Sequence, residues 1–190
     1  MHTMRRPVHV VLCTLAMVAA PGAASAQARD RTEWFAGYSY LLDPGNAVLA
    51  VTAGDNAFPL GWIAGGARPI ASWMAAAGEI SGHYKHKTTF DDDVSLSFHA
   101  FMAGPRVHAR LGPITEFAQL LAGAAHARGS AFGVTVSSTA LSLQPGGGID
   151  YQLRPRLAAR LELDYRWIRG AGEGRAHASQ FRAAAILVVR

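Results

Sequence analysis

Leu-Ala-Ala-Arg-Leu-Glu-Leu-Asp-Tyr-Arg-Trp-Ile, from Leu157 to Ile168, is the stretch that decides the fold. Its alternate positions form an apolar face that ends in Tyr165 and Trp167, while Arg160, Glu162, Asp164 and Arg166 share the opposite face. An alternation with period two is typical of a β-strand whose two faces meet different surroundings. In a helix the same charges would be scattered around the cylinder and no continuous apolar stripe would remain. The stretch therefore predicts a strand.

Two kinds of β-protein could contain such a strand. In a soluble sandwich the apolar face packs against a second sheet. In a membrane barrel the apolar face meets lipid and the charged face lines the interior. The soluble alternative to a membrane barrel is a secreted periplasmic barrel, which would need other elements to cover its aromatic faces. The sequence offers no helices for that purpose, so it favours the membrane barrel.

The first 26 residues have the composition of a secretory signal. Arg5 and Arg6 precede an apolar run over residues 8–20, and Ala24-Ser25-Ala26 forms a small-residue cleavage site. The apolar run is shorter than the roughly 20 residues that a membrane-spanning helix needs. We therefore expect cleavage after Ala26, which leaves residues 27–190 as one barrel domain.

The composition narrows the class of protein further. Cleavage removes two arginines and no acidic residue, so the formal net charge falls from +5 to +3. The remaining arginines are spread singly with no basic cluster between aromatics, which does not favour nucleic-acid binding. The one cysteine, Cys13, lies in the signal, so no disulfide is expected after cleavage. No later stretch is apolar enough for a membrane helix, so entry into a membrane requires a closed barrel.

Eight strands are expected, and the charged or aromatic residues assign the faces of most of them. They lie at residues 33–42, 61–67, 73–84, 95–109, 114–128, 141–153, 157–168 and 179–189. Arg106 would fall on the same face as Leu96 to Met102 unless the strand phase shifts, so we expect a β-bulge at Gly104-Pro105. The faces of residues 114–128 stay unassigned, because each side carries one polar residue, Glu116 or Gln119.

The connections between these strands alternate in length. Three short turns each contain a proline, Pro69, Pro113 or Pro155. The connections between them, at residues 43–60, 85–94, 129–138 and 169–178, are longer, polar and glycine-bearing or charged. Short periplasmic turns and longer outer loops are typical of outer-membrane barrels, and an even number of strands places both mature termini in the periplasm.

Aromatic and charged residues take the positions that such a barrel requires. Aromatic girdles are expected at the periplasmic rim (Trp34, Trp73, Tyr151) and at the outer rim (Tyr40, Trp62, Tyr84, Tyr165, Trp167, Phe181). The expected luminal charges are Glu79, Asp150, Arg160, Glu162, Asp164, Arg166 and Arg182. These charges either pair with one another and plug the lumen, or form a selectivity constriction for small ions. We favour the plug, because an eight-stranded barrel is just wide enough for side chains to fill.

Several segments resemble the small bacterial outer-membrane β-barrel proteins, the family of the outer membrane protein A transmembrane domain and its opacity-type relatives. The matching segments are residues 34–40, 61–62, 81–84, 104–106, 146–150 and 155–156, with Arg160 and Asp164-Tyr165. The resemblance implies an eight-stranded up-and-down barrel in the outer membrane of a Gram-negative bacterium, surrounded by lipid and inserted by the barrel-assembly machinery. It implies no catalytic residue and no cofactor. Family members end on an aromatic residue that this machinery reads, whereas this chain ends Val188-Val189-Arg190.

The expected function is a structural or surface-interaction role carried by the outer loops, whose partner the sequence does not identify. A narrow porin-like diffusion channel is the alternative. A lipid-modifying enzyme is a remote alternative. Its candidate catalytic pairs are His99 with Ser97 or Ser95, and His126 with Ser130, but no third carboxylate that would orient the histidine is evident. A metal site of His83, His86 and residues 91–93 is less favoured than solvated loop charge, because nothing in the sequence fixes the geometry of these residues.

Overall fold

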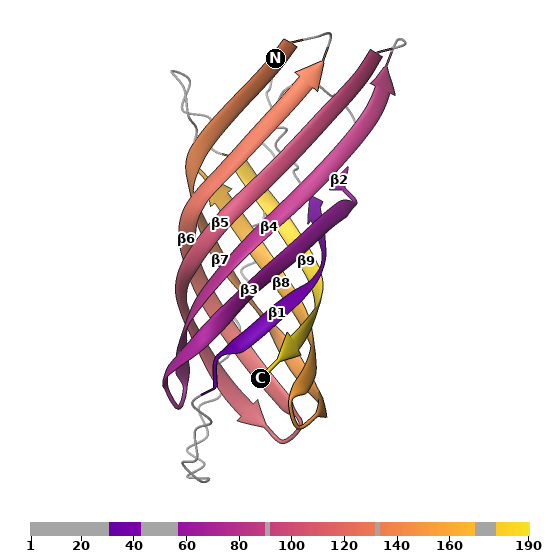
Figure 1. The fold of residues 1–190 in the computed structure, drawn as a ribbon. Coiled ribbons are helices and arrows are strands. Elements are labelled where there is room, and N and C mark those ends of the chain that lie inside the picture. The colour runs from indigo at the N-terminus through magenta and orange to yellow at the C-terminus, as the bar shows by residue number, and fades with distance from the viewer. Residues whose placement is uncertain (1–30, 43–56, 90–91, 132–133, 170–177) are drawn as a thin grey trace, which may run out of the picture.

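The chain forms a closed antiparallel β-barrel (Figure 1). The computed structural model describes residues 31–42, 57–89, 92–131, 134–169 and 178–190. The predicted signal, Cys13, Asp91 and most of the predicted first loop lie outside the described residues. Among the described residues no helix is long and apolar enough to cross a membrane, a finding that concerns helical spans only. The predicted fold, an eight-stranded antiparallel barrel, is confirmed.

Each long strand pairs with the next long strand in sequence, and the pairing of the last strand with the first closes the wall. The strands are β1 (Glu33–Leu42), β2 (Ala57–Phe58), β3 (Leu60–Ala71), β4 (Met74–Thr89), β5 (Asp92–Leu111), β6 (Ile114–Ala131), β7 (Val134–Arg154), β8 (Leu157–Ile168) and β9 (Ala178–Val189). The two-residue β2 lies inside the predicted first loop and pairs only with the end of β1, where Phe58 is opposite Leu41. The described wall therefore consists of eight long strands.

Strand β8 has the two faces that its sequence predicts. From Ala158 to Ile168 every even-numbered residue is buried and every odd-numbered residue is exposed. The outward side chains of Leu161 and Leu163 are 61% and 69% exposed, whereas Arg160 on the inner face is 2% exposed. Apolar side chains exposed to this extent on a continuous strand face are expected where the surroundings are lipid rather than water.

Strand β5 shows that the predicted bulge is wrong. The register of β5 with β4 runs without a shift through Gly104 and Pro105, and its register with β6 is the same on both sides of these residues. Arg106 therefore lies on the same face as Phe98 and Met102, and this face is the interior. The outward face of β5 is also largely apolar, with Phe101 among its exposed residues, so the hydrophobic pattern alone could not distinguish the two faces.

The structure assigns the two faces of strand β6, which the sequence left unassigned. Its odd-numbered residues Thr115, Phe117, Gln119 and Leu121 are buried in the interior. Glu116 is exposed on the outer face, near the turn to β5. Of the two polar residues that left the assignment open, Gln119 is thus the one that reaches the interior.

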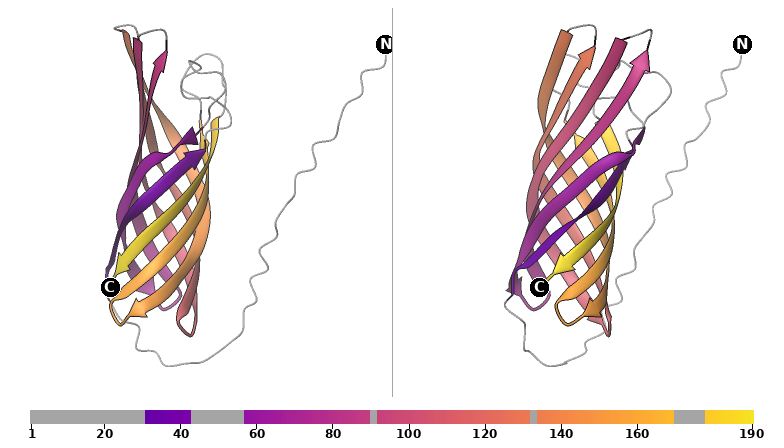
Figure 2. Two further views of the ribbon diagram at one scale, coloured as in Figure 1. Left: turned by 90° about the vertical axis from the view of Figure 1, so that its right-hand side faces the viewer. Right: turned by 45° about the vertical axis from the view of Figure 1, so that its right-hand side comes forward.

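Four strands extend beyond the rest of the barrel, which differs from the predicted loops at residues 85–94 and 129–138. The β4–β5 hairpin is paired up to Thr89 and Asp92, and the β6–β7 hairpin up to Ala131 and Val134. We call residues 85–89, 92–98, 126–131 and 134–141 the protruding sheet; Figure 2 shows it rising at the end opposite to the C-terminus. Threonine or valine occurs in three of these four segments and favours strand structure, which outweighs the charges and glycine that suggested loops.

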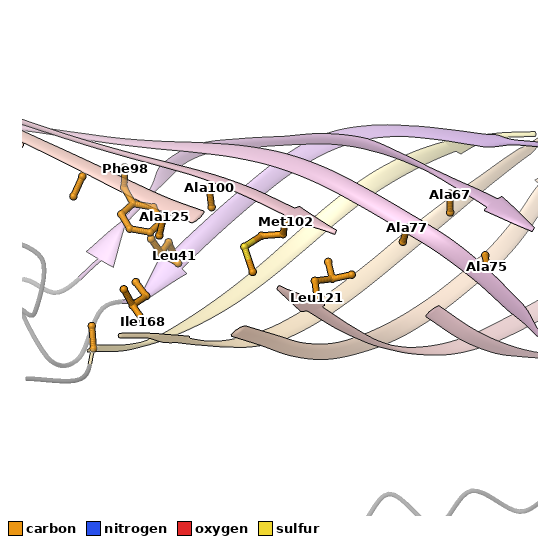
Figure 3. Close-up of a cluster of buried hydrophobic side chains, with 12 residues drawn as sticks. Leu41, Ala67, Ala75, Ala77, Phe98, Ala100, Met102, Leu121, Ala125 and Ile168 are labelled. Atoms are coloured by element: carbon orange, nitrogen blue, oxygen red, sulfur yellow. The ribbon is translucent and has the colours of Figure 1, made fainter. Parts of the chain in front are cut away.

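An apolar layer occupies the interior near the protruding sheet. Figure 3 shows Leu41, Phe98, Ala125 and Ile168 close together there, and all four belong to one buried cluster. The ring of Phe98 also lies 5.4 Å from the guanidinium carbon of Arg166. The apolar layer therefore borders directly on the charged part of the interior.

Candidate functional site

The seven charged residues predicted to line the interior all face it in the structure. Strand β8 supplies four of them at every second position, and β4, β7 and β9 supply one each. Each is 5% exposed or less: Glu79, Asp150, Arg160, Glu162, Asp164, Arg166 and Arg182. A one-residue slip of β8 would turn its four charges toward the outside, so this face fixes the register of the strand.

Arg182 is the centre of the network. Its Nη1 lies 2.7 Å from Glu79 Oε1, and its Nη2 lies 2.7 Å from Glu162 Oε1 and 2.6 Å from Asp164 Oδ2. Gln119 Nε2 donates a further hydrogen bond to Asp164 Oδ1 at 3.1 Å. Three buried carboxylates this close repel one another strongly at low dielectric, and the guanidinium between them compensates this repulsion.

A second cluster lies toward the chain ends. Arg160 Nε donates to Asp150 Oδ1 at 2.6 Å, and Arg160 Nη2 donates to Glu33 Oε1 at 2.8 Å. Arg106 Nη1 donates to the same Glu33 oxygen at 2.7 Å. The C-terminal Arg190 contacts both acids, through an ion pair of 3.2 Å to Glu33 and a hydrogen bond to Asp150. This cluster joins β1, β5, β7, β8 and the residue after β9.

Two phenylalanines pack against the arginines of this second cluster. The guanidinium carbons of Arg106 and Arg160 lie 4.6 and 4.5 Å from the centre of the Phe117 ring. The same carbons lie 5.4 and 5.2 Å from the centre of the Phe35 ring. Both rings are within the distance at which a cation is attracted to an aromatic face. The two arginines are therefore stabilised by the rings as well as by Glu33.

Arg166 is held by neutral groups. Its Nε donates to Gln144 Oε1 at 2.8 Å and its Nη2 to Ser81 Oγ at 3.4 Å. Gln144 in turn donates to Glu79 Oε1 at 2.8 Å, which connects Arg166 to the central acids. Among the described residues, Arg166 Nη1, His83 Nδ1 and the side-chain amide of Gln180 have no hydrogen-bond partner. Buried polar atoms of this kind commonly bind internal water.

Two interior glycines make room for the network. A Cβ atom on Gly146 would lie 1.8 Å from Asp164 Oδ1, and one on Gly148 would lie 2.1 Å from Leu161 O and 2.9 Å from Phe117 Cζ. Real Cβ atoms do not approach other atoms this closely. These glycines on β7 therefore allow the aspartate of β8 and the phenylalanine of β6 to occupy the interior.

The sequence prediction missed several members of the network. Glu33, Arg106 and Arg190 complete the second cluster, and Gln119 and Gln144 bridge the central one. In the period-two pattern of β1, Trp34 faces outward and the adjacent Glu33 therefore faces the interior. The pattern of β5, continued without a bulge, would have placed Arg106 in the interior as well. No sequence signal assigned Gln119, since the faces of its strand were ambiguous.

The predicted girdle residues all lie on the outer face or in a turn. Trp34, Trp73 and Tyr151, near the chain ends, are more than half exposed. The remaining six lie toward the protruding sheet and are partly or about half exposed: Tyr40, Trp62, Tyr84, Tyr165, Trp167 and Phe181. The rings of Tyr165 and Phe181 pack edge to face with centroids 5.0 Å apart. Aromatic side chains in these positions are typical of the two membrane interfaces.

Among the described residues, which do not include Asp91, the structure does not bring together the metal or enzyme sites that the sequence left as alternatives. His83 points inward and bonds Ser39 at 2.9 Å, whereas His86 is exposed on the other face. In the part of the chain that the structure describes, no group of three or more metal-binding side chains is present. The hydrogen bonds of His99 and His126 go to Tyr84 and Thr139 rather than to a serine.

Solved structures with the same architecture are known. One of them is Ail, the attachment invasion locus protein of Yersinia pestis, which was solved in complex with the heparin analogue sucrose octasulfate. Ail aligns over 83% of this chain and 97% of its own, with a TM-score of 0.55 and 16% identity. The fold is that of the small bacterial outer-membrane β-barrels. Neisserial surface protein A aligns over 83% of this chain and 94% of its own, with a TM-score of 0.59 and 12% identity. No protein-family model and no curated protein sequence matches the chain.

Proposed function

We propose that this chain is an integral outer-membrane protein of a Gram-negative bacterium, with a structural or surface-interaction role and a lumen plugged by its own charges. The observation that carries the proposal is the buried network around Arg182, in which one guanidinium pairs with Glu79, Glu162 and Asp164. The interior of an eight-stranded barrel is just wide enough for side chains to fill it. The apolar layer of Phe98 and its neighbours fills the end nearer the protruding sheet.

The proposed orientation places both chain ends in the periplasm and the protruding sheet outside the cell. The turns at Ser72-Trp73, Gly112-Pro113 and Pro155-Arg156 are short and lie at the end of the barrel that holds the C-terminus. The longer extensions lie at the other end, as in outer-membrane barrels generally. Outer-membrane lipid would surround the apolar outer face, and the barrel-assembly machinery would insert the chain.

The surface-interaction role rests on the edge of the protruding sheet. Residues 134–140 of β7 pair with β6 on one side, whereas among the described residues the hydrogen bonds toward the β8 side begin at Leu141, whose carbonyl accepts from Arg169 N. This segment, Val-Thr-Val-Ser-Ser-Thr-Ala, carries no charge. The opposite edge, on β4, carries Lys85 and His86, and lysine on an edge strand discourages pairing with other chains. The β7 edge is therefore the side where an extended segment of a partner would add a strand.

A narrow porin-like channel is the second candidate. It is favoured by the buried polar atoms of His83, Arg166 and Gln180 that have no partner among the described residues, because such atoms can line a water-filled path. The apolar layer of Leu41, Phe98 and Ile168 opposes it. No catalytic role and no cofactor is proposed, in keeping with the hydrogen-bonding of His99 and His126 to groups other than serine.

Single-channel recording in a planar bilayer tests the plug. We expect no discrete openings from protein confirmed to be folded. We also expect Arg160→Gln to lower the free energy of unfolding by about 3 kcal/mol without producing conductance, because it leaves buried acids less compensated. The exposed Arg154→Gln is the matched control. Stable openings of the unmodified protein, or an Arg160→Gln variant that changes conductance but not stability, would establish the channel instead.

A further inference from the structure

We propose that His99 and His126 form a binding site for one divalent transition-metal ion, such as Zn²⁺, Ni²⁺ or Cu²⁺, where the protruding sheet joins the barrel. The two histidines lie on β5 and β6 and are directly opposite each other in the antiparallel register. Both are partly exposed on the outer face of the sheet. Directly opposite residues have Cβ atoms about 4.5–5.5 Å apart, so two imidazoles in this position can reach one ion.

Hydroxyl groups on the flanking strands fix both rings. Tyr84 on β4 hydrogen-bonds His99 Nε2 at 3.1 Å, and Thr139 on β7 hydrogen-bonds His126 Nδ1 at 2.7 Å. Each ring is therefore held from the side away from its partner histidine. The two nitrogens of an imidazole point in widely different directions, so His99 Nδ1 and His126 Nε2 lie on the sides of their rings that face away from Tyr84 and Thr139.

The free nitrogens can take the state that a metal requires, since either ring nitrogen of a neutral histidine can carry the proton. Neither His99 Nδ1 nor His126 Nε2 hydrogen-bonds any described residue. When the other ring nitrogen donates its proton to the hydroxyl oxygen, the free nitrogen carries the lone pair. Metal-binding histidines in proteins are usually oriented in this way, with the second nitrogen donating to an oxygen. Tyr84 and Thr139 thus act as positioning residues for the site.

The surroundings select the class of ion. Imidazole nitrogen suits zinc, nickel and copper, whereas calcium and magnesium require several oxygen ligands. In the described part of the chain no acid joins these histidines to form a larger ligand group. Arg128 lies two residues from His126 on the same face and opposite Ser97, so its positive charge disfavours ions that bind by charge alone. Water would complete the coordination, because both histidines are accessible.

Metal titration of the full chain, purified from membranes in detergent without an affinity tag, tests the site. Calorimetry with ZnCl₂ or NiCl₂ should give one ion per barrel. His99→Gln and His126→Gln should each weaken binding by at least about tenfold, since each removes one of two ligands. Thr139→Val keeps both histidines and should weaken binding by about tenfold, the lower end of what loss of an orienting partner costs. His86→Gln, an exposed histidine of the same sheet, should bind like the unmodified protein.

A second readout separates binding from a structural role of the pair. At a free metal concentration of about 100 times the dissociation constant, the unfolding equilibrium constant should fall about a hundredfold, and this shift should vanish in His99→Gln. The proposal is overturned if the unmodified protein binds no metal. It is also overturned if His86→Gln weakens binding as much as His126→Gln does, or if the folded His99→Gln and His126→Gln variants bind with unchanged affinity.

Discussion

Replacing Arg182 with glutamine should be among the most damaging single substitutions in the barrel. The change removes the positive charge that lies within 2.7 Å of Glu79, Glu162 and Asp164. Glutamine can donate two hydrogen bonds at most, and it cannot neutralise three carboxylates. The variant therefore retains buried acidic groups whose repulsion is no longer compensated.

The expected loss follows from the burial of these groups. Removing one partner of a buried ion pair costs about 3–5 kcal/mol, because the remaining charge is left without compensation. The loss at Arg182 should lie in this range rather than at three times it, because neighbouring interactions are not additive and the acids can take up protons. Gln144 and Gln119 also continue to bond Glu79 and Asp164. The unfolding equilibrium constant should therefore rise by roughly a hundredfold to several thousandfold.

Reversible urea unfolding of the folded barrel in lipid vesicles measures this loss. Arg154→Gln, at an exposed position near a turn, should change the free energy of unfolding by less than about 0.5 kcal/mol. Adding Glu162→Gln to Arg182→Gln should restore part of the stability, since it removes one uncompensated acid. A loss below about 1 kcal/mol for Arg182→Gln, or no recovery in the double variant, would refute the reasoning that the network is a compensated buried structure.

Three further predictions concern the walls and turns, and the same unfolding measurement checks each. Gly146→Ala should cost about 1–3 kcal/mol because its Cβ would meet Asp164, whereas Gly78→Ala, whose Cβ is 3.9 Å from its nearest neighbour, should be nearly neutral; equal losses would contradict this. Gly112→Ala should cost about 1–2 kcal/mol, since the turn holds this residue at φ 64°, and no loss would mean that the turn relaxes. Leu163→Arg, on the outer face that we propose meets lipid, should lower the free energy of unfolding by about 2–4 kcal/mol, whereas the control Ser137→Arg, in the protruding sheet, should hardly change it. Similar losses in the two variants would argue against lipid around Leu163.

The sequence was sufficient to predict the barrel where each strand carries different chemistry on its two faces. In β8 the inner face holds Arg160 to Arg166 and the outer face ends in Tyr165 and Trp167, so only one orientation avoids placing charge in lipid. Strand β9, with Arg182 inside and Phe181 outside, follows the same logic. The seven charges found to be buried were assigned from this alternation alone.

The length of the protruding sheet could not be predicted in the same way. The predicted second loop contains a run of acidic residues, and the predicted third loop is rich in glycine and serine, which are compositions typical of loops. The structure instead pairs these segments as hairpins up to Thr89 and Ala131. Strand pairing beyond the barrel depends on the cross-strand partner of each residue, and the composition of one segment does not contain that information.

The error in β5 has a physical origin in the barrel itself. The interior changes character along its axis, from ion pairs near the chain ends to an apolar layer near the protruding sheet. Strand β5 passes through both regions, so its inner face carries Phe98 and Met102 in one and Arg106 in the other. A rule that assigns apolar faces to lipid therefore fails for a strand that lines the apolar layer. The proposed closed lumen fits the same division, because an ion that passed the charged network would still have to cross a mainly apolar layer, where few polar groups can replace its hydration.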